Sequence, residues 1–366
     1  MSVTAAPTGP ARPGRLRALA ATACVLATVA ACGGGAHGWR APGKGQAAVW
    51  VDASRGGGGN SAEQAAAAGF DGPVQGFAAG SDEDLYVLGS ELVRVGADRK
   101  AAVVLSHDVA TANGLAPLPH GAFATGMGGA VERVLGGAAT LLAGVAGTSS
   151  ASGPHRAVGQ PAPRSAPAVG FHFAAAGPVP FATRPDGSVL IADTDVVWSL
   201  NDSRLTRLYQ LPTGKAKSGQ DLLSYGAVDH AGTTYVAAGS TYLKRAGAIT
   251  AIGTDGRTRT LPLPASIPSV TGDPGDLNVL WLTGDASDGV YVRAEDQHHD
   301  YVLHLHDGTA QLVARAATDA TSGTCHLPHP VRATALPCAL PTTMAASPSG
   351  LTLAGHAGYV LRVALP

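Results

Sequence analysis

Short apolar runs separated by polar turns fill most of the chain after residue 70, and residues 178–211 show the pattern most clearly. An apolar stretch leads into Pro185-Asp186-Gly187, and an alternating run at 189–192 follows. Two more apolar runs, 196–200 and 205–211, complete the segment. Runs of this length with such turns are typical of antiparallel strands. The segment therefore predicts one four-stranded unit in about 35 residues.

Imperfect copies of this unit recur along the chain. We place them at 74–105, 114–144, 178–211, 222–263, 278–316 and 342–365. A repeat of about 40 residues built from short strands is typical of propeller blades. We therefore predict an all-β fold, an irregular six-bladed β-propeller of four-stranded antiparallel blades. An elongated array or two β-sandwiches are the alternatives.

The last copy contains only three predicted strands before the chain ends. A closed ring needs a fourth strand there, and an early segment can supply it. The candidates are residues 47–51 and 76–79.

Two segments, 140–147 and 181–194, resemble NHL-repeat propellers. The residues on the family pattern are Asp186, Gly187, Ile191, Ala192, Asp193 and Thr194. After them this chain has Asp195-Val196-Val197-Trp198 in place of the family's Gly-Asn-His-Arg-Ile. The resemblance implies a propeller fold, and propellers of this kind serve mostly as binding scaffolds.

The N-terminus has the features of an export signal. Three arginines (Arg12, Arg15 and Arg17) precede an apolar segment that ends at Val29-Ala30-Ala31-Cys32, and this segment is too short to span a bilayer. The pattern resembles a bacterial lipoprotein signal, which implies that Cys32 carries diacylglycerol and that residues 1–31 are removed. An ordinary secretory signal cut near Ala31 is the alternative.

These features predict three parts: a signal peptide at 1–31, a glycine-rich tether at 32–70 and the propeller at 71–366. A lipid on Cys32 would hold the propeller at the extracytoplasmic face of the plasma membrane. The formal net charge of −1, with 14% charged residues, gives no field to attract nucleic acid.

The chain has four cysteines. Cys24 leaves with the signal peptide and Cys32 takes the lipid. Cys325 and Cys338 remain, 13 positions apart, and an exported protein meets an oxidising compartment. We therefore predict a disulfide between them, which would stabilise the fold by about 3 kcal/mol through loop closure.

Two pairs of side chains are candidate metal ligands. His304 and His306 would project from one face of a strand, a spacing that can chelate zinc or copper. A solvated strand face is the alternative. Asp193 and Asp195 could bind calcium through oxygen, or could hold turns through backbone N–H groups.

No catalytic motif is evident in the sequence, and no cofactor is expected. We expect a module that binds an unknown protein or small molecule, with the long loops 148–173 and 317–341 as its recognition surface. The alternative is a propeller hydrolase or lactonase with a metal in the central channel. A third possibility is an assembly factor for envelope proteins. Three or more acidic or histidine side chains meeting at the ring axis would favour the hydrolase.

Overall fold

The computed structural model divides the chain into residues 1–38 and 39–366. It describes residues 39–52, 76–79, 84–88, 92–96, 101–105, 112–147, 153–212, 222–239, 249–318, 325–355 and 359–366. Cys32, the signal peptide and most of the tether lie outside these residues. In the described residues no helix has the length and apolar character needed to cross a membrane.

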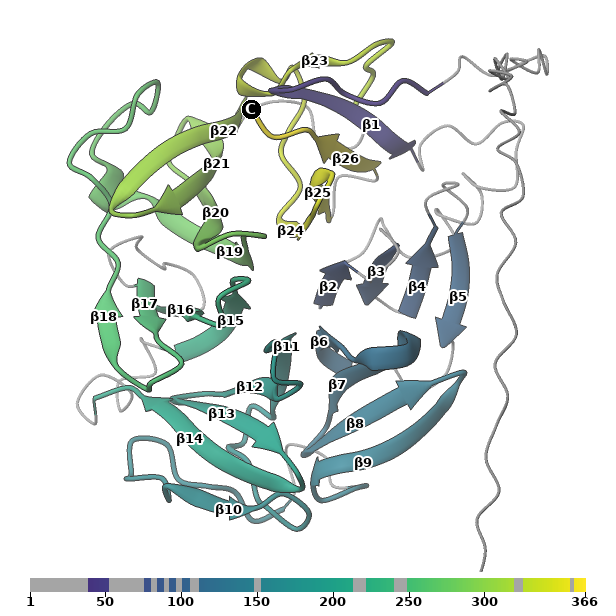
Figure 1. Cartoon of the computed structure of the whole chain (residues 1–366), viewed down its shortest axis with the longest axis vertical. Coiled ribbons are helices and arrows are strands. Elements are labelled where there is room, and N and C mark those ends of the chain that lie inside the picture. Colours follow the sequence, from purple (N-terminus) through teal and green to yellow (C-terminus); the bar gives the residue numbers. More distant parts are fainter. Residues whose placement is uncertain are drawn as a thin grey trace, which may run out of the picture. The chain divides into compact units, whose positions relative to one another are not determined.

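Residues 39–366 form a six-bladed β-propeller, as predicted (Figure 1). Blade 1 contains β2 (Gly76–Ala79), β3 (Leu85–Leu88), β4 (Leu92–Val95) and β5 (Ala101–Leu105). Blade 2 contains β6 (Ala112–Pro117), β7 (Phe123–Met127), β8 (Ala130–Leu135) and β9 (Ala138–Gly144). Blade 3 contains β11 (Val179–Thr183), β12 (Val189–Asp193), β13 (Val196–Asn201) and β14 (Arg204–Gln210).

Blade 4 contains β15 (Leu222–Val228), β16 (Thr234–Gly239), β17 (Ile249–Ile252) and β18 (Thr258–Thr260). Blade 5 contains β19 (Asn278–Gly284), β20 (Gly289–Glu295), β21 (His299–His306) and β22 (Thr309–Ala317). Blade 6 contains β24 (Thr343–Ser347), β25 (Gly350–Ala354), β26 (Tyr359–Val363) and β1 (Gln46–Asp52). The helices of the described residues are three short 3₁₀ turns, η2 (Pro119–Gly121), η4 (Pro274–Asp276) and η5 (Ala333–Ala335).

Strand β1 closes the ring. It pairs antiparallel with β26, so the N-terminal strand completes the blade that the C-terminus leaves short. This confirms the first of the two predicted closing segments, because β2 instead begins blade 1. The propeller therefore includes residues that the sequence analysis assigned to the tether.

Two blades carry a fifth strand, which the sequence analysis did not predict. The long connections after β9 and β22 each run to the outer edge of the next blade. There β10 (Ser165–Pro167) pairs with β14, and β23 (Val331–Arg332) pairs with β1. Each connection also forms one parallel bridge with the strand that precedes it. Val169 bridges to Gly144 of β9, and Leu336 bridges to Ala316 of β22. The described parts of these two connections thus take equivalent positions on blades 3 and 6.

The predicted turns explain the hairpins. Gly187 has a φ of +83°, a conformation that favours glycine. Asp186 accepts hydrogen bonds from the backbone N–H and the hydroxyl of Ser188 through Oδ1. The turn residues thus hold the β11–β12 hairpin through hydrogen bonds within the turn.

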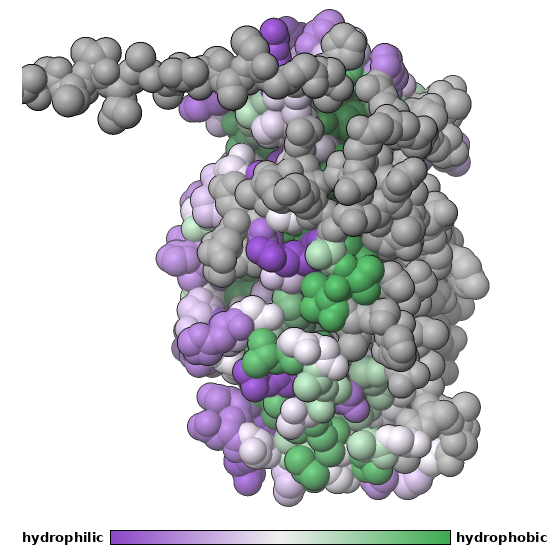
Figure 2. Space-filling model, turned by 90° about the vertical axis from the view of Figure 1, so that its right-hand side faces the viewer, coloured by the Kyte–Doolittle hydropathy of each residue, from purple (hydrophilic) through white to green (hydrophobic). Residues whose placement is uncertain are grey.

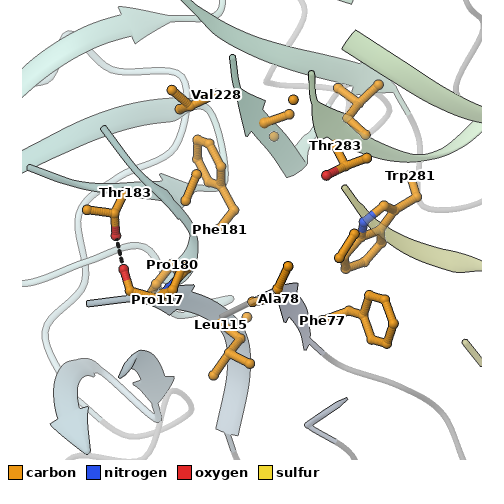
Figure 3. Close-up of a pocket in the computed structure, with 18 of the residues that line it drawn as sticks. Phe77, Ala78, Leu115, Pro117, Pro180, Phe181, Thr183, Val228, Trp281 and Thr283 are labelled. Carbon is orange, nitrogen blue, oxygen red and sulfur yellow. Dashed lines mark hydrogen bonds between the residues drawn. The ribbon is translucent and has the colours of Figure 1, made fainter. Parts of the chain in front are cut away.

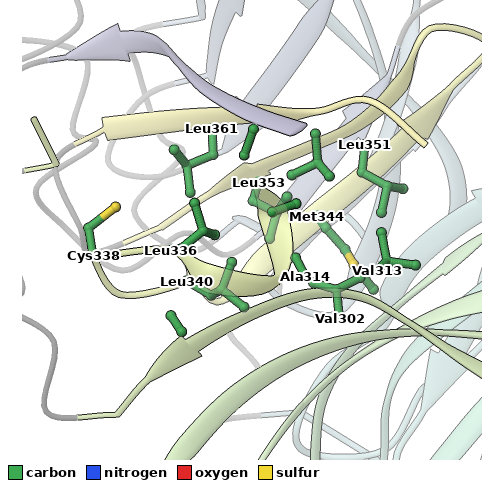
Figure 4. Packing of buried hydrophobic residues seen from close by; sticks show 14 of the residues in the cluster. Val302, Val313, Ala314, Leu336, Cys338, Leu340, Met344, Leu351, Leu353 and Leu361 are labelled. Atoms are coloured by element: carbon green, nitrogen blue, oxygen red, sulfur yellow. The ribbon is translucent and has the colours of Figure 1, made fainter. Parts of the chain in front are cut away.

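Apolar side chains fill the space between neighbouring sheets. Between blades 5 and 6, Val302 and Val313 pack against Met344, Leu353 and Leu361 (Figure 4). All five are at most 3% exposed, so the layer between these two blades is a buried hydrophobic core. Each sheet buries both faces only because it has a neighbour on each side, which explains why the ring must close.

The outer rim near β5 and β9 mixes hydrophilic and hydrophobic side chains (Figure 2). Val103 and Leu135 are the large apolar residues most exposed on these blades, at 50% and 42% among the described residues. Isolated apolar side chains of this kind are normal on a protein surface.

Candidate functional site

The innermost strand of every blade faces the centre of the ring. In order around the ring, β2, β6, β11, β15, β19 and β24 each contact the next, and β24 contacts β2. These six strands surround a cavity of about 200 Å³, shown in Figure 3. A cavity formed by all blades is the natural candidate for the functional site.

Glycines allow the inner strands to approach one another closely. A Cβ on Gly284 of β19 would lie 1.7 Å from the carbonyl oxygen of Val228 on β15. A Cβ on Gly226 of β15 would lie 2.4 Å from the ring of Phe181 on β11. Neither gap admits a methyl group, so these glycines keep the ring tight and the cavity small.

Side chains also tie neighbouring inner strands together with hydrogen bonds. Trp281 Nε1 donates to the carbonyl of Met344 at 2.8 Å, joining β19 to β24. The Thr283 hydroxyl accepts from the backbone N–H of Ala346 at 3.2 Å across the same seam. Thr183 donates to the carbonyl of Pro117 and joins β11 to β6 (Figure 3). These bonds satisfy part of the backbone that strand edges would otherwise leave unpaired.

The described lining of the cavity is neutral. Phe181 and Trp281 contribute aromatic rings, whereas the ring of Phe77 points away from the cavity into the core between blades 1 and 6 (Figure 3). The lining residues include no Asp, Glu, His, Lys or Arg. Asn113 on β6 has the most exposed polar side chain among them. The cavity can therefore offer apolar contact, an amide and backbone groups, but no ionisable group from this part of the chain.

This lining does not suit a metal ion. Calcium takes six to eight oxygen ligands, usually including carboxylates. The described residues contain no group of three or more His, Cys, Asp or Glu that could hold a metal. The convergence of acidic or histidine side chains that would mark a metal-dependent hydrolase is not found among the described lining residues.

His304 and His306 lie on β21, away from the cavity lining. Their rings stack with centroids 6.0 Å apart, and His304 also stacks on Tyr291 at 4.5 Å. His304 Nε2 lies 2.9 Å from Asp285 Oδ2. Burial lowers the pKa of His304 below its usual value, and the attraction of Asp285 only partly offsets this. The structure thus shows His304 bonded to a carboxylate, and its proposed role as a metal ligand stays a prediction.

Asp193 and Asp195 hold a buried arginine. Arg156, from the connection after β9, donates through Nε to Asp193 Oδ2 at 3.0 Å and through Nη2 to Asp195. Asp193 also accepts from Trp198 Nε1 at 3.0 Å and from the backbone N–H of Ala174 at 2.7 Å. Burial alone would lower the pKa of Arg156, but the two carboxylates raise it above its usual value. Both aspartates therefore fix the connection to blade 3.

The two loops predicted to form the recognition surface are largely structural where they are described. The first supplies Arg156 and β10, and the second supplies β23. In the second loop Cys325 and Cys338 are joined in the predicted disulfide. Arg293 of β20 donates to the carbonyls of Pro341 and Leu340, which fixes the end of that loop.

The cavity could not be predicted from the sequence, because the residue types that line it are not specific to any chemistry. The aromatic, threonine and small residues of the inner strands read as ordinary strand residues. One usable signal was present: glycine recurs within the inner strands, at Gly114, Gly226 and Gly284. Glycine inside a strand often marks the close approach of another backbone.

No family model matches the chain, and no curated protein matches it significantly. Among solved structures, 210 chains match significantly. One is a protein of unknown function from Bacteroides thetaiotaomicron, with a TM-score of 0.56 and 12% identity over 87% of this chain and 75% of that one. Another is a putative gluconolactonase, with a TM-score of 0.50 and 13% identity over 87% and 91% of the two chains.

A third is regucalcin from Agrobacterium tumefaciens, described as a calcium-binding protein, with a TM-score of 0.47 and 11% identity over 81% and 92% of the chains. The neighbours with a described function here are thus a putative gluconolactonase and a regucalcin. At these identities the likeness itself shows the fold alone.

Proposed function

We propose that the protein is a propeller whose central cavity binds a small uncharged organic molecule. The observation that carries this proposal is the lining: the aromatic rings of Phe181 and Trp281, an exposed amide and no ionisable group among the described residues. Ligand sites are usually apolar with a few polar groups that fix orientation, and this lining has that composition.

The size of the cavity limits the ligand. Its volume of about 200 Å³ is below the range of roughly 300–1,000 Å³ typical of drug-sized ligands. Phe181 and Trp281 come from different blades and present ring surface to the cavity (Figure 3). The amide of Asn113 offers both a donor and an acceptor. A compact molecule with one apolar face and a few hydroxyl or carbonyl groups, such as a monosaccharide or a sugar lactone, fits this description.

Neutrality follows from the cost of desolvation. A charged ligand would lose its hydration in the cavity, and the described lining offers no opposite charge in return. A sugar lactone and its ring-opened carboxylate therefore form a sensitive pair of probes, because they differ little in size but differ in charge.

Calorimetry on the full chain tests the proposal. The panel contains neutral monosaccharides, a sugar lactone and the matching aldonate anion. We expect a neutral compound to bind, the anion to bind at least tenfold more weakly, and Phe181→Ala to reduce the affinity at least tenfold. Phe171→Ala, which removes an aromatic ring packed on Trp198 in the core of blade 3, is the control and should retain binding. Equal binding of lactone and anion, or no binding at millimolar concentration, would refute the proposal.

A second candidate is hydrolysis of a lactone, favoured by the structural likeness to the putative gluconolactonase. The reaction adds water across the ring ester and releases a hydroxy acid. The described lining supplies no carboxylate or histidine as general base and no set of metal ligands. A pH-stat assay with the lactone, run with added calcium and with chelator, decides this candidate. Turnover above the rate without protein supports hydrolysis, and binding without turnover supports the binding role alone.

We also propose that Cys32 anchors the protein to the outer face of the plasma membrane. The support is the sequence from Val29 to Cys32, which resembles a lipoprotein signal. Replacing Cys32 with Ala should move the protein from the membrane fraction to the soluble fraction of the cell envelope. Unchanged membrane partitioning of the variant would refute the anchor.

A further inference from the structure

A groove on the outer rim of the ring has a chemistry opposite to that of the central cavity. It lies between β14 of blade 3, the segment that precedes β10, and β18 of blade 4. Its volume is about 670 Å³, within the usual range for ligand sites. The polar side chains lining it are Arg164, Thr206, Arg207, Tyr209, Gln210 and Thr258.

From the charge and geometry of this groove, we propose that it binds a small organic anion through a carboxylate or phosphate group held by Arg164 and Arg207. No acidic residue is among the described residues that line the groove. The carboxylate of Asp195 lies within 3.1 Å of Gln210 Nε2, but its side chain is fully buried and paired with Arg156. Arg156 also pairs with Asp193, so this cation offsets only part of the charge of the two buried carboxylates.

Hydrogen bonds hold the Arg207 side chain in place and leave some of its N–H donors available for a ligand. Its Nη1 donates to the carbonyl of Ala162 and, at 2.9 Å, to Gln210 Oε1. A guanidinium has five N–H donors, and Nη1 carries two of them. The Nε and Nη2 donors have no protein partner in the described part of the chain. They form the fork that suits bidentate binding of a carboxylate or phosphate.

The orientation of Arg207 is set by a network that reaches the core. Gln210 Nε2 donates to the carbonyl of Gln160 at 2.7 Å and to Asp195, and Gln210 Oε1 accepts from the backbone N–H of Ala162 at 3.1 Å. The Arg207 side chain therefore loses little freedom on binding a ligand, and such preorganisation favours affinity. Arg164 lies on the segment next to β14, where its carbonyl accepts a hydrogen bond from the backbone N–H of Arg207 at 2.9 Å. Its side chain is exposed and makes no hydrogen bond within the described residues.

Calorimetry at low ionic strength tests this site. The probes are a diuronate for the carboxylate, glycerol phosphate for the phosphate, and a neutral disaccharide as a negative control. We expect one anion to bind, the neutral sugar not to bind, and the affinity to fall as salt is added. Arg164→Gln and Arg207→Gln should each weaken binding at least tenfold, and Arg207→Lys should not restore it fully because the fork is lost.

Arg332→Gln is the matched control. Arg332 lines a second rim groove of about 450 Å³, so it is an equally surface-located arginine outside the proposed site. Binding should be unchanged in this variant. An equal loss in the control, or no anion binding at millimolar concentration in 20 mM salt, would overturn the proposal. Because Arg164 is exposed, its variant should keep the wild-type melting temperature and remains decisive if Arg207→Gln is unstable.

Discussion

Arg156→Ala should strongly destabilise the propeller. The change would leave Asp193 and Asp195 without their shared cation, and both carboxylate side chains are 0% exposed. Removing one partner of a buried ion pair typically costs 3–5 kcal/mol because the remaining charge is uncompensated. At roughly 2–3 °C per kcal/mol for a large domain, the melting temperature should fall by roughly 6–15 °C.

The dependence on pH gives this prediction a second readout. Burial raises the pKa of Asp193, and Arg156 partly offsets this rise, so Asp193 gains a proton more readily in the variant. The difference in stability between wild type and variant should therefore shrink as the pH falls from 7 toward 4.5. Substituting Asn at both aspartates in an Arg156→Met background should recover part of the loss, because no buried charge then remains.

Differential scanning fluorimetry and urea unfolding at several pH values provide the measurements. Arg257→Ala is the control, since its guanidinium is 91% exposed and lies 3.5 Å from an exposed aspartate. That variant should melt close to the wild-type temperature. A loss below about 1 kcal/mol for Arg156→Ala, or a loss that does not vary with pH, would show that the pair contributes little.

Three further predictions concern other parts of the fold. Replacing Cys325 and Cys338 with Ser should lower the free energy of unfolding by about 3 kcal/mol, measured by urea titration; the same midpoint as the wild type would contradict this. Gly284→Ala should cost about 1–3 kcal/mol because its Cβ would lie 1.7 Å from a backbone oxygen of β15, whereas Gly275→Ala, with its nearest contact at 3.2 Å, is the milder control. His304 has a lowered pKa, so the unfolded chain binds its proton at higher pH and the folded state loses stability as the pH falls below about 6.5. His304→Gln should therefore lose less stability than the wild type between pH 7 and 5. The same dependence of the unfolding free energy on pH in both proteins would contradict this prediction.

The blades could be predicted because each uses local signals. Alternation of apolar and polar residues identified the strands of blades 3 to 5, and the Asp-Gly turns marked their hairpins. Strand β6 escaped because Ala112–Pro117 contains Asn, Gly and Pro, which are depleted in strands. Gly114 in this strand has a φ of +73°, and its Cβ would lie 2.3 Å from the carbonyl oxygen of Pro180. The position is therefore set by contact with blade 3, which no local pattern reveals.

The binding surfaces were less predictable because they depend on which residues meet. Arg156 is 37 residues from Asp193 in sequence, and nothing in either segment indicates their pairing. The same holds for Arg164 and Thr258, which come from neighbouring blades and face one groove. Sequence patterns located the loops, whose role in recognition stays a prediction. Their described parts secure the edges of blades 3 and 6, and the first loop also supplies Arg164 to the rim groove.

The central cavity and the rim groove select ligands by opposite physical rules. In the cavity, the close strand contacts at Gly226 and Gly284 keep the volume small and so exclude large ligands. The neutral lining disfavours a charged ligand, because no opposite charge compensates for its lost hydration. On the rim, Arg164 and Arg207 favour an anion that remains partly hydrated. A neutral compound and its anionic derivative would therefore distribute between different sites of the same molecule. Added salt should weaken only the rim site, so the ionic strength dependence of each probe reveals which site it occupies.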